Sequence, residues 1–146
     1  MQIKEILKVK GSDVYNIAPD ATVYDAVKLM SDLNVGALLV MRDRKMAGII
    51  TERDYRNKII LKGRASKDTA VQEIMTSEVF CVKETETVDS CLQIMTDKKI
   101  RHIPVMNDDD SVAGMVSIGD LVKAVIQKQK VEISTLKSYI YGESPL

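Results

Sequence analysis

The sequence predicts an α+β fold of two β-α-β-β-α repeats, packed about a pseudo-two-fold axis, with an extended helix at the C-terminus. A motif of glycine, two apolar residues, Thr or Ser, two variable positions and aspartate occurs twice, at 48–54 and 114–120. Other positions repeat at a constant offset of 65. Because each repeat of about 60 residues would bury only a small core alone, we expect the two repeats to share one. The positions that recur identically are Val14, Thr22, Val23, Met30, Asp32, Val40 and Met41, matched by Val79, Thr87, Val88, Met95, Asp97, Val105 and Met106.

Each repeat opens with a short apolar segment and a short strand. The segment 3–7 is matched by 71–75, and the predicted strand 14–17 is matched by 79–82. A helix follows, and its expected N-cap is Thr22 in the first repeat and Thr87 in the second. Apolar residues then recur at the i, i+3, i+4 and i+7 spacing of one helix face.

A predicted β-hairpin and a closing helix complete each repeat. Strands 37–41 and 46–50 flank a polar turn, as do strands 102–106 and 112–116. One residue inserted in the second turn shifts the offset to 66. The closing helices are expected from about Glu52 to Lys62 and from about Gly119 onward. The polar segment 63–68 breaks the first of them. We therefore divide the chain into a first repeat (1–66), a second repeat (67–130) and a helical tail (131–146).

The tail continues the last helix and carries loosely periodic apolar residues between Val122 and Tyr141. Such residues would be exposed in a single chain, so we expect them to pack against a partner. A homodimer is the expected form, and the sequence does not give its orientation.

Composition excludes several classes of function. Lys+Arg and Asp+Glu balance at 21 each, so no overall basic field attracts nucleic acid or anionic lipid. The longest apolar stretches fall short of the about 18 residues of a membrane span, and the N-terminus does not resemble a secretory signal. Two cysteines without CxxC spacing make no disulfide framework. We expect a cytoplasmic protein without nucleic-acid or membrane partners.

The repeated motif has two possible roles. Thr51 and Ser117 would cap helices, and Asp54 and Asp120 would lie in the first helical turn, as in a capping box. Free N–H groups and the positive end of the helix dipole also suit a phosphate there, and carboxylate oxygens suit a ribose diol. The occurrence of two copies in register favours the ligand-binding role.

The two intact motifs, together with Arg101-His102-Ile103-Pro104-Val105, resemble those of a tandem pair of cystathionine-β-synthase (CBS) domains, also called a Bateman module. The match covers residues 3 to about 128 and is similar to small stand-alone CBS-pair proteins of bacteria and plant organelles. The first repeat departs from the pattern at Asn34-Val35-Gly36, where the Arg-His pair and the proline are lacking.

The resemblance implies that adenosine-containing ligands bind in a cleft between the repeats. AMP is the expected ligand, with ADP, ATP, S-adenosylmethionine or NAD(H) as alternatives, and no catalytic cofactor or metal is expected. Asp54 and Asp120 would bind ribose hydroxyls, with Thr51 and Ser117 beside the ribose or the α-phosphate. The resemblance also implies an adenine wall in the site of the second repeat, formed by Val79, Val82, Ile100, His102 and Pro104.

The basic residues have two possible roles, contacts to a ligand phosphate or a solvated surface. Arg53, Arg64 and Lys67 lie in a basic run that is either a solvated helix face or a source of charge-assisted contacts to phosphate. Arg101 is the stronger candidate, because it adjoins the predicted adenine wall. His102, the one histidine, either faces the ligand or is structural.

Two functions remain open at this stage. The first is a regulatory module that senses energy or redox state through an adenine nucleotide and modulates an unknown partner protein by a population shift. The second is a ligand-independent dimerisation or interaction module. We do not expect an enzyme, since the sequence offers no nucleophile–base pair, metal set or phosphate-binding loop of the Walker type.

Overall fold

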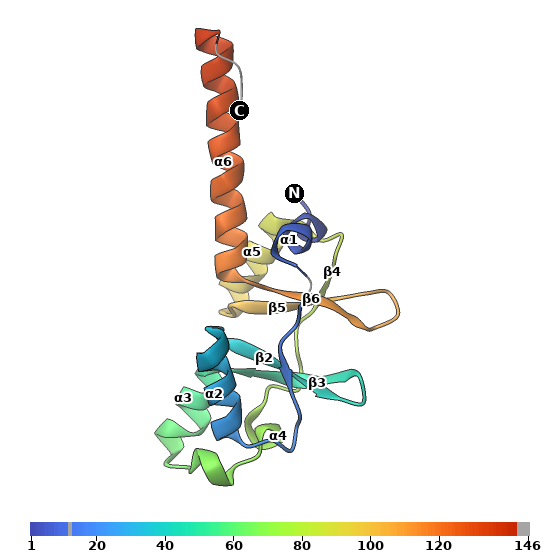
Figure 1. Cartoon of the computed structure of the whole chain (residues 1–146), viewed down its shortest axis with the longest axis vertical. Coiled ribbons are helices and arrows are strands. Elements are labelled where there is room, and N and C mark those ends of the chain that lie inside the picture. The colour runs from blue at the N-terminus through green and yellow to red at the C-terminus, as the bar shows by residue number, and fades with distance from the viewer. Residues whose placement is uncertain (12, 143–146) are drawn as a thin grey trace.

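The computed structural model describes residues 1–11 and 13–142, and its two repeats stack one above the other. In Figure 1 a long helix projects away from both of them. The predicted α+β class and the repeated β-α-β-β-α order are confirmed. Residues 143–146 of the expected tail lie outside the described residues.

Both repeats have the same three-stranded sheet, in which the first strand is parallel and the third antiparallel to the middle strand. The first repeat contains β1 (Asn16–Ile17), α2 (Val23–Leu33), β2 (Ala37–Arg42), β3 (Lys45–Thr51) and α3 (Glu52–Lys58). The second contains β4 (Val82–Lys83), α5 (Val88–Lys98), β5 (His102–Met106), β6 (Val112–Ser117) and α6 (Ile118–Tyr141). The remaining helices are α1 (Ile3–Lys10), α4 (Val71–Ile74) and the 3-10 turns η1 (Ile60–Lys62) and η2 (Ser66–Asp68).

The predicted caps and turns are confirmed. The hydroxyl of Thr22 accepts a hydrogen bond from the Asp25 N–H, and that of Thr87 accepts one from the Ser90 N–H. The first hairpin turns through Asp43 and Arg44, which have φ values of 49° and 66° and so match the twist of the strands. The second hairpin is longer, and its strands close at the pair Met106 and Val112.

Some elements are shorter than the sequence predicts. β1 begins at Asn16 and β4 at Val82, two and three residues after the expected starts at Val14 and Val79. Val14 and Val79 instead pack against apolar residues between the repeats. The α-helical part of α3 ends at Lys58, and the chain continues to Lys62 through the 3-10 turn η1.

The buried apolar residues form three clusters, which together make the shared core predicted from the sequence. Each sheet packs one face against the long helix of its own repeat, α2 or α5, and against the first helix of the other repeat. The third cluster joins the halves, because Ala37, Leu39 and Ile49 of the first sheet lie with Val112 and Met115 of the second. Alternation along β2 produces this division, since Leu38 and Val40 point into the first core while Ala37 and Leu39 point toward the other repeat.

The first helix of each repeat packs on the other repeat. Ile3, Ile6 and Leu7 of α1 belong to the core of the second repeat, whereas Val71 and Ile74 of α4 belong to that of the first. Figure 1 shows α1 beside α5 and β6, and α4 beneath the first sheet. The packing units therefore cross the expected boundary between residues 66 and 67.

The glycine of each repeated motif makes room for the exchanged segment. A methyl group added at Gly48 would lie 2.6 Å from the backbone oxygen of Thr76, and one added at Gly114 would lie 2.8 Å from the side chain of Leu7. Both distances are shorter than real van der Waals contacts. The motif thus begins with glycine because a neighbouring segment crosses β3 and β6 at these points.

Gly48→Ala is expected to lower the free energy of unfolding by about 1–3 kcal/mol, the usual cost of overpacking a core. Gly114→Ala is expected to lower it less. The added methyl group at Gly48 meets the backbone carbonyl of Thr76, which cannot move without shifting the chain. The one at Gly114 meets the end of the Leu7 side chain, which can rotate away. The free energy of unfolding in urea measures both effects. Gly119→Ala is the control: its added methyl group has the Ser117 Oγ as nearest atom, at 3.7 Å, so no loss is expected. Equal losses in the Gly48 and Gly114 variants would contradict the argument.

Candidate functional site

Both repeated motifs form capping boxes. Ser117 Oγ accepts from the Asp120 N–H at 3.2 Å, and Asp120 Oδ2 accepts from the Ser117 N–H at 2.8 Å. Thr51 and Asp54 make the same pair of bonds at 3.2 and 3.1 Å. The capping role considered from the sequence is therefore present at both motifs. It leaves acceptor capacity on each carboxylate for further partners.

The two aspartates nevertheless differ in their access to a ligand. The side chain of Asp54 is 9% exposed, and its Oδ1 lies 2.9 Å from Lys58 Nζ and 3.3 Å from the Thr76 hydroxyl, which donates to it. The side chain of Asp120 is 24% exposed, and its Oδ2 accepts from Lys10 Nζ at 2.6 Å. Asp54 is thus enclosed by its own repeat and the α4 segment, while Asp120 is accessible from one side.

Asp120 opens onto a hollow of about 280 Å³ between the repeats. Ser117 and His102 also line it, so three of the residues predicted for a ligand site lie together. The other lining residues come mainly from the N-terminal segment and the turn after α2, namely Lys10, Asp13, Val14, Tyr15, Asn34, Val35, Gly36, Ala37 and Met115.

The apolar wall beside Asp120 comes from the first repeat. Val14, Val35 and Ala37 line the hollow. The resemblance had implied that residues of the second repeat form the apolar wall. At an offset of 65, Val14 corresponds to Val79 and Ala37 to His102. The pseudo-two-fold relation therefore assigns Val79 to the side of Asp54. The hollow beside Asp120 thus combines the acceptor of the second repeat with an apolar wall from the first.

Four other predicted wall or phosphate residues lie outside this hollow. Val82 is buried in the second core, and Ile100 packs against the same core. Pro104 is buried in β5, on the face that it shares with His102. The exposed Arg101 has its backbone oxygen bonded to the Ile118 N–H, at the start of α6.

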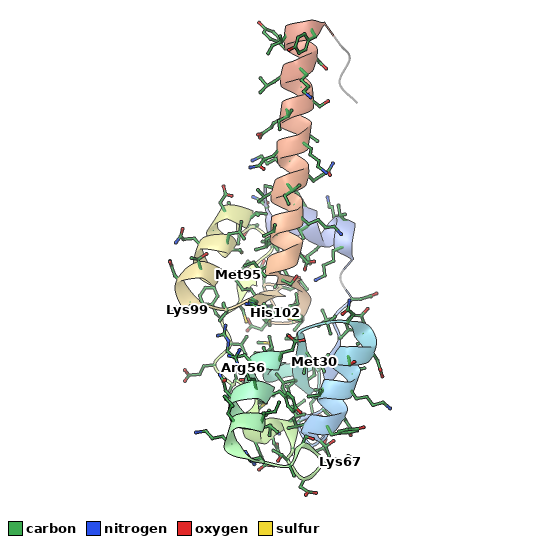
Figure 2. All side chains as sticks on the ribbon, turned by 90° about the vertical axis from the view of Figure 1, so that its left-hand side faces the viewer. Met30, Arg56, Lys67, Met95, Lys99 and His102 are labelled. Atoms are coloured by element: carbon green, nitrogen blue, oxygen red, sulfur yellow. The ribbon has the colours of Figure 1, made fainter. Side chains whose placement is uncertain are left out.

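The basic run around α3 does not reach the hollow. Arg64 pairs with Glu73 at 2.8 Å, and Lys67 lies over the ring of Tyr24, with 4.8 Å from Nζ to the ring centroid. Figure 2 shows Lys67 at the end of the first repeat remote from His102. Arg53 is exposed on α3 and does not line the hollow. These positions fit the solvated-face alternative.

A second, larger hollow of about 480 Å³ lies between α2 and α3 of the first repeat. It shares Asn34, Val35 and Gly36 with the first hollow, and its other lining includes Met30 and Tyr55. Neither aspartate of the repeated motifs is among its described lining residues. We therefore place the candidate site in the smaller hollow, where acceptor, cation and apolar wall meet.

Charge and burial set the ionisation of the site. Burial raises the pKa of Asp120, but the hydrogen bonds from Lys10 and the Ser117 backbone outweigh it, so the net pKa is below the ordinary value. Burial lowers the pKa of His102, the nearby Lys10 and Arg101 lower it further, and Asp120 opposes them. At neutral pH the site therefore presents a carboxylate, an ammonium group and a neutral imidazole.

The two thiols do not have the lowered pKa of reactive cysteines. Burial raises the pKa of Cys91 to about 11, with a further contribution from Glu86, and burial also raises that of Cys81. Packing is the role that these environments support. Among the described residues, the structure contains no cluster of three or more His, Cys, Asp or Glu side chains suited to a metal ion.

Sequence reasoning missed most of the first-repeat side of the hollow. Lys10 lies at the end of α1, which packs on the second repeat and so reaches Asp120, a residue 110 positions away. One sequence feature pointed to this side of the hollow: around Gly36 the first repeat lacks the Arg-His pair and the proline that the second repeat has. A methyl group at Gly36 would lie 3.2 Å from His102 Cε1, so the missing side chain makes room for the imidazole.

This geometry defines a class of protein: a pair of pseudo-symmetric α+β repeats with a polar hollow between them. The chain belongs to the CBS domain family, whose model matches it twice, over residues 3–60 and 71–127. The resemblance seen in the sequence is thereby confirmed.

Individual relatives agree with this family. The chain is 46% identical to the CBS domain-containing protein CBSX3, mitochondrial, of Arabidopsis thaliana, over 96% of this chain and 72% of that protein. A protein with CBS domains from Burkholderia ambifaria is 43% identical, with a TM-score of 0.84 over 88% of this chain and 96% of that one. The CBS domain pair of protein MJ0100, solved with 5′-methylthioadenosine and S-adenosyl-L-methionine, is 26% identical, with a TM-score of 0.77 over 88% of this chain and 98% of that one.

Protonation of His102 is expected to destabilise the fold. Its folded pKa lies below the unfolded value of about 6.5, so the unfolded chain binds the proton more readily. Stability is unaffected well above that value and falls as the pH drops through it. His102 is the one histidine, so urea unfolding of wild type and His102→Gln between about pH 7.5 and 5.5 isolates the effect. Wild type should lose more stability than the variant, and parallel losses would contradict the assignment.

Proposed function

We propose that this chain is a regulatory module that binds one adenosine-containing ligand of mononucleotide size in the hollow beside Asp120. The observation that carries the proposal is the access to Asp120: its carboxylate reaches the hollow, whereas that of Asp54 is enclosed by Lys58 and Thr76. The proposal therefore assigns the principal site to the acceptor of the second repeat.

The residues around Asp120 match the parts of a nucleotide. Asp120 would accept hydrogen bonds from the ribose hydroxyls, and Ser117 would lie beside the ribose or the α-phosphate. Val14 and Ala37 offer apolar surface to the adenine ring. The start of α6 and the ammonium group of Lys10 supply the positive potential that a phosphate requires.

The volume of the hollow favours a small ligand. At about 280 Å³ it lies near the lower limit of roughly 300 Å³ for small-molecule sites. A mononucleotide or nucleoside therefore fits better than NAD(H). AMP is our proposed ligand, with 5′-methylthioadenosine and S-adenosylmethionine as alternatives suggested by the complex of the MJ0100 domain pair.

Regulation would follow from the position of the hollow between the repeats. Its lining comes from both repeats, so a bound ligand favours one relative orientation over others. We propose that a homodimer presents this change to a partner protein in the cytoplasm and that the module itself is not an enzyme. None of the helices in the described residues is long and apolar enough to cross a bilayer.

Asp120→Asn is expected to weaken AMP binding by about tenfold or more, while Asp54→Asn has a smaller effect. A hydrogen bond to a charged group contributes about 1.5–3 kcal/mol, and 1.4 kcal/mol is a factor of ten. Isothermal titration of nucleotide-stripped protein with AMP measures both variants, and circular dichroism confirms that they are folded.

The pattern of results distinguishes the alternatives. Equal losses in the two variants would contradict the assignment of the principal site to Asp120. Absence of binding by folded wild-type protein to AMP, ATP, NADH and S-adenosylmethionine would overturn the ligand-binding function and favour the interaction module.

Lys10→Met is expected to weaken AMP binding more than 5′-methylthioadenosine binding. The two ligands share the adenosine part, but only AMP carries a phosphate that the Lys10 ammonium group can attract. The ratio of the two dissociation constants is the readout, because a general loss of site structure would change both equally. Lys8→Met is the matched control, since Lys8 is exposed on the same helix and does not line the hollow. An unchanged ratio would remove Lys10 from the phosphate site.

A further inference from the structure

The second half of α6 extends beyond the body of the molecule and is rich in exposed apolar side chains. Figures 1 and 2 both show this helix rising clear of the two repeats. Only Leu121 of its 24 residues is buried, and Val125 packs against the second core. The exposed large apolar residues along it are Ile118, Val122, Ile126, Val131, Ile133, Leu136, Tyr139, Ile140 and Tyr141.

Six positions along this helix follow a heptad repeat. Ile126, Ile133 and Ile140 are spaced by seven residues and occupy position a. Val122, Gln129 and Leu136 are spaced by seven residues and occupy position d. We call these six residues the α6 seam. An isolated helix gains little from such a seam in water, whereas two paired helices bury it.

The seam lies on a different face of α6 from the residues that pack on the second core. At 100° per residue, it lies roughly a quarter of a turn around the helix from Leu121 and Val125, which face the second core. Val122 and Ile126, the seam residues nearest the body of the molecule, are 44% and 47% exposed, so the seam is accessible to a second helix along its length.

We propose that α6 pairs with α6 of a second copy of this chain in a parallel, in-register, two-stranded coiled coil. This specifies how the homodimer of the proposed function is built. Its test needs no nucleotide, so failure of this inference and failure of ligand binding are separate results.

The residue types at the seam favour two strands. Isoleucine occupies position a in all three heptads, and this favours a parallel dimer where leucine occupies position d, as it does at Leu136. The other two d positions are Val122 and Gln129. Gln129 is the one polar residue among the six, and a single polar seam position fixes register at some cost in stability.

The flanking charges favour the parallel orientation. Position e is lysine in all three heptads, at Lys123, Lys130 and Lys137. Position g is Val125, Glu132 and Tyr139, so Glu132 is its one charged residue. In a parallel pair, g of one helix lies beside e of the next heptad of the other, so Glu132 meets Lys137 of the second copy. An antiparallel pair would bring e against e and place lysines together. The charges at positions e and g therefore favour parallel pairing of α6 with α6 of a second copy.

Sedimentation velocity at a series of protein concentrations tests the association. Ile133→Ser combined with Ile140→Ser should raise the dimer dissociation constant at least tenfold. Val131→Ser combined with Tyr141→Ser is the matched control, because these positions f and b are also exposed but lie off the seam. A wild-type chain that stays monomeric to about 100 µM, or a dimer equally stable in both double variants, would overturn the proposal.

Cross-linking tests the register. Leu136→Cys places a thiol at position d, where identical residues face each other in a parallel pair, so mild oxidation should give a disulfide-linked dimer. Lys128→Cys lies off the seam and is the control. Wild type gives the baseline for the native thiols, of which Cys91 is buried and Cys81 is half-buried. Equal cross-linking at 128 and 136 would exclude the in-register seam.

A charge exchange tests the orientation. Glu132→Lys and Lys137→Glu should each weaken the dimer, and the double variant should restore most of the loss. In an antiparallel pair, Lys137→Glu alone would instead strengthen association by relieving the contact between lysines. That outcome would overturn the parallel assignment.

Discussion

The exchange of first helices between the repeats is the packing arrangement on which the rest of the structure depends. α1 completes the core of the second repeat and α4 completes that of the first. Each crosses a strand at a glycine, and the backbone bonds between Ile49 and Thr76 fix one of the crossings. Neither repeat is therefore a self-sufficient folding unit, because each lacks part of its core without the other. The third apolar cluster, between the two sheets, adds a direct contact to this mutual dependence.

The same exchange makes the two candidate sites unequal. The segment after α4 brings the hydroxyl of Thr76 to Asp54, and Lys58 closes the remaining side. The end of α1 brings the longer side chain of Lys10 to Asp120, and the hollow stays open beside it. The hydroxyl of Thr76 and the ammonium group of Lys10 thus contact corresponding aspartates. Two motifs with the same pattern acquire different access because the residues that contact them from the exchanged segments differ.

The sequence predicts the local structure well and the interrepeat contacts poorly. Hairpins, the Thr22 and Thr87 caps and the last helix depend on neighbouring residues, so periodicity and capping rules suffice to find them. Asp120, Ser117 and His102, which line the hollow, were predicted for the site because they belong to a repeated motif or a family pattern. Lys10 belongs to no motif. It reaches Asp120 because α1 packs on the other repeat, and this is a property of the tertiary structure.

Arg64 and Lys67 show what a charge run leaves undetermined. A basic run allowed either phosphate contacts or a solvated helix face. Arg64 pairs with Glu73, Lys67 lies over the ring of Tyr24, and neither residue lines the hollow beside Asp120. Charge composition alone does not say on which face of a short helix and its following turns a side chain emerges.

The capping box at Ser117 and Asp120 has a mechanical consequence. These residues hold the first turn of a helix of 24 residues, about 36 Å long at 1.5 Å per residue. Since the helix is rigid, a rotation of about 5° at its start would displace its far end by about 3 Å. The Asp120 carboxylate lies beside the hollow and in the first turn of this helix. A small rotation of that turn would therefore shift the far end of α6 by about the size of an atom.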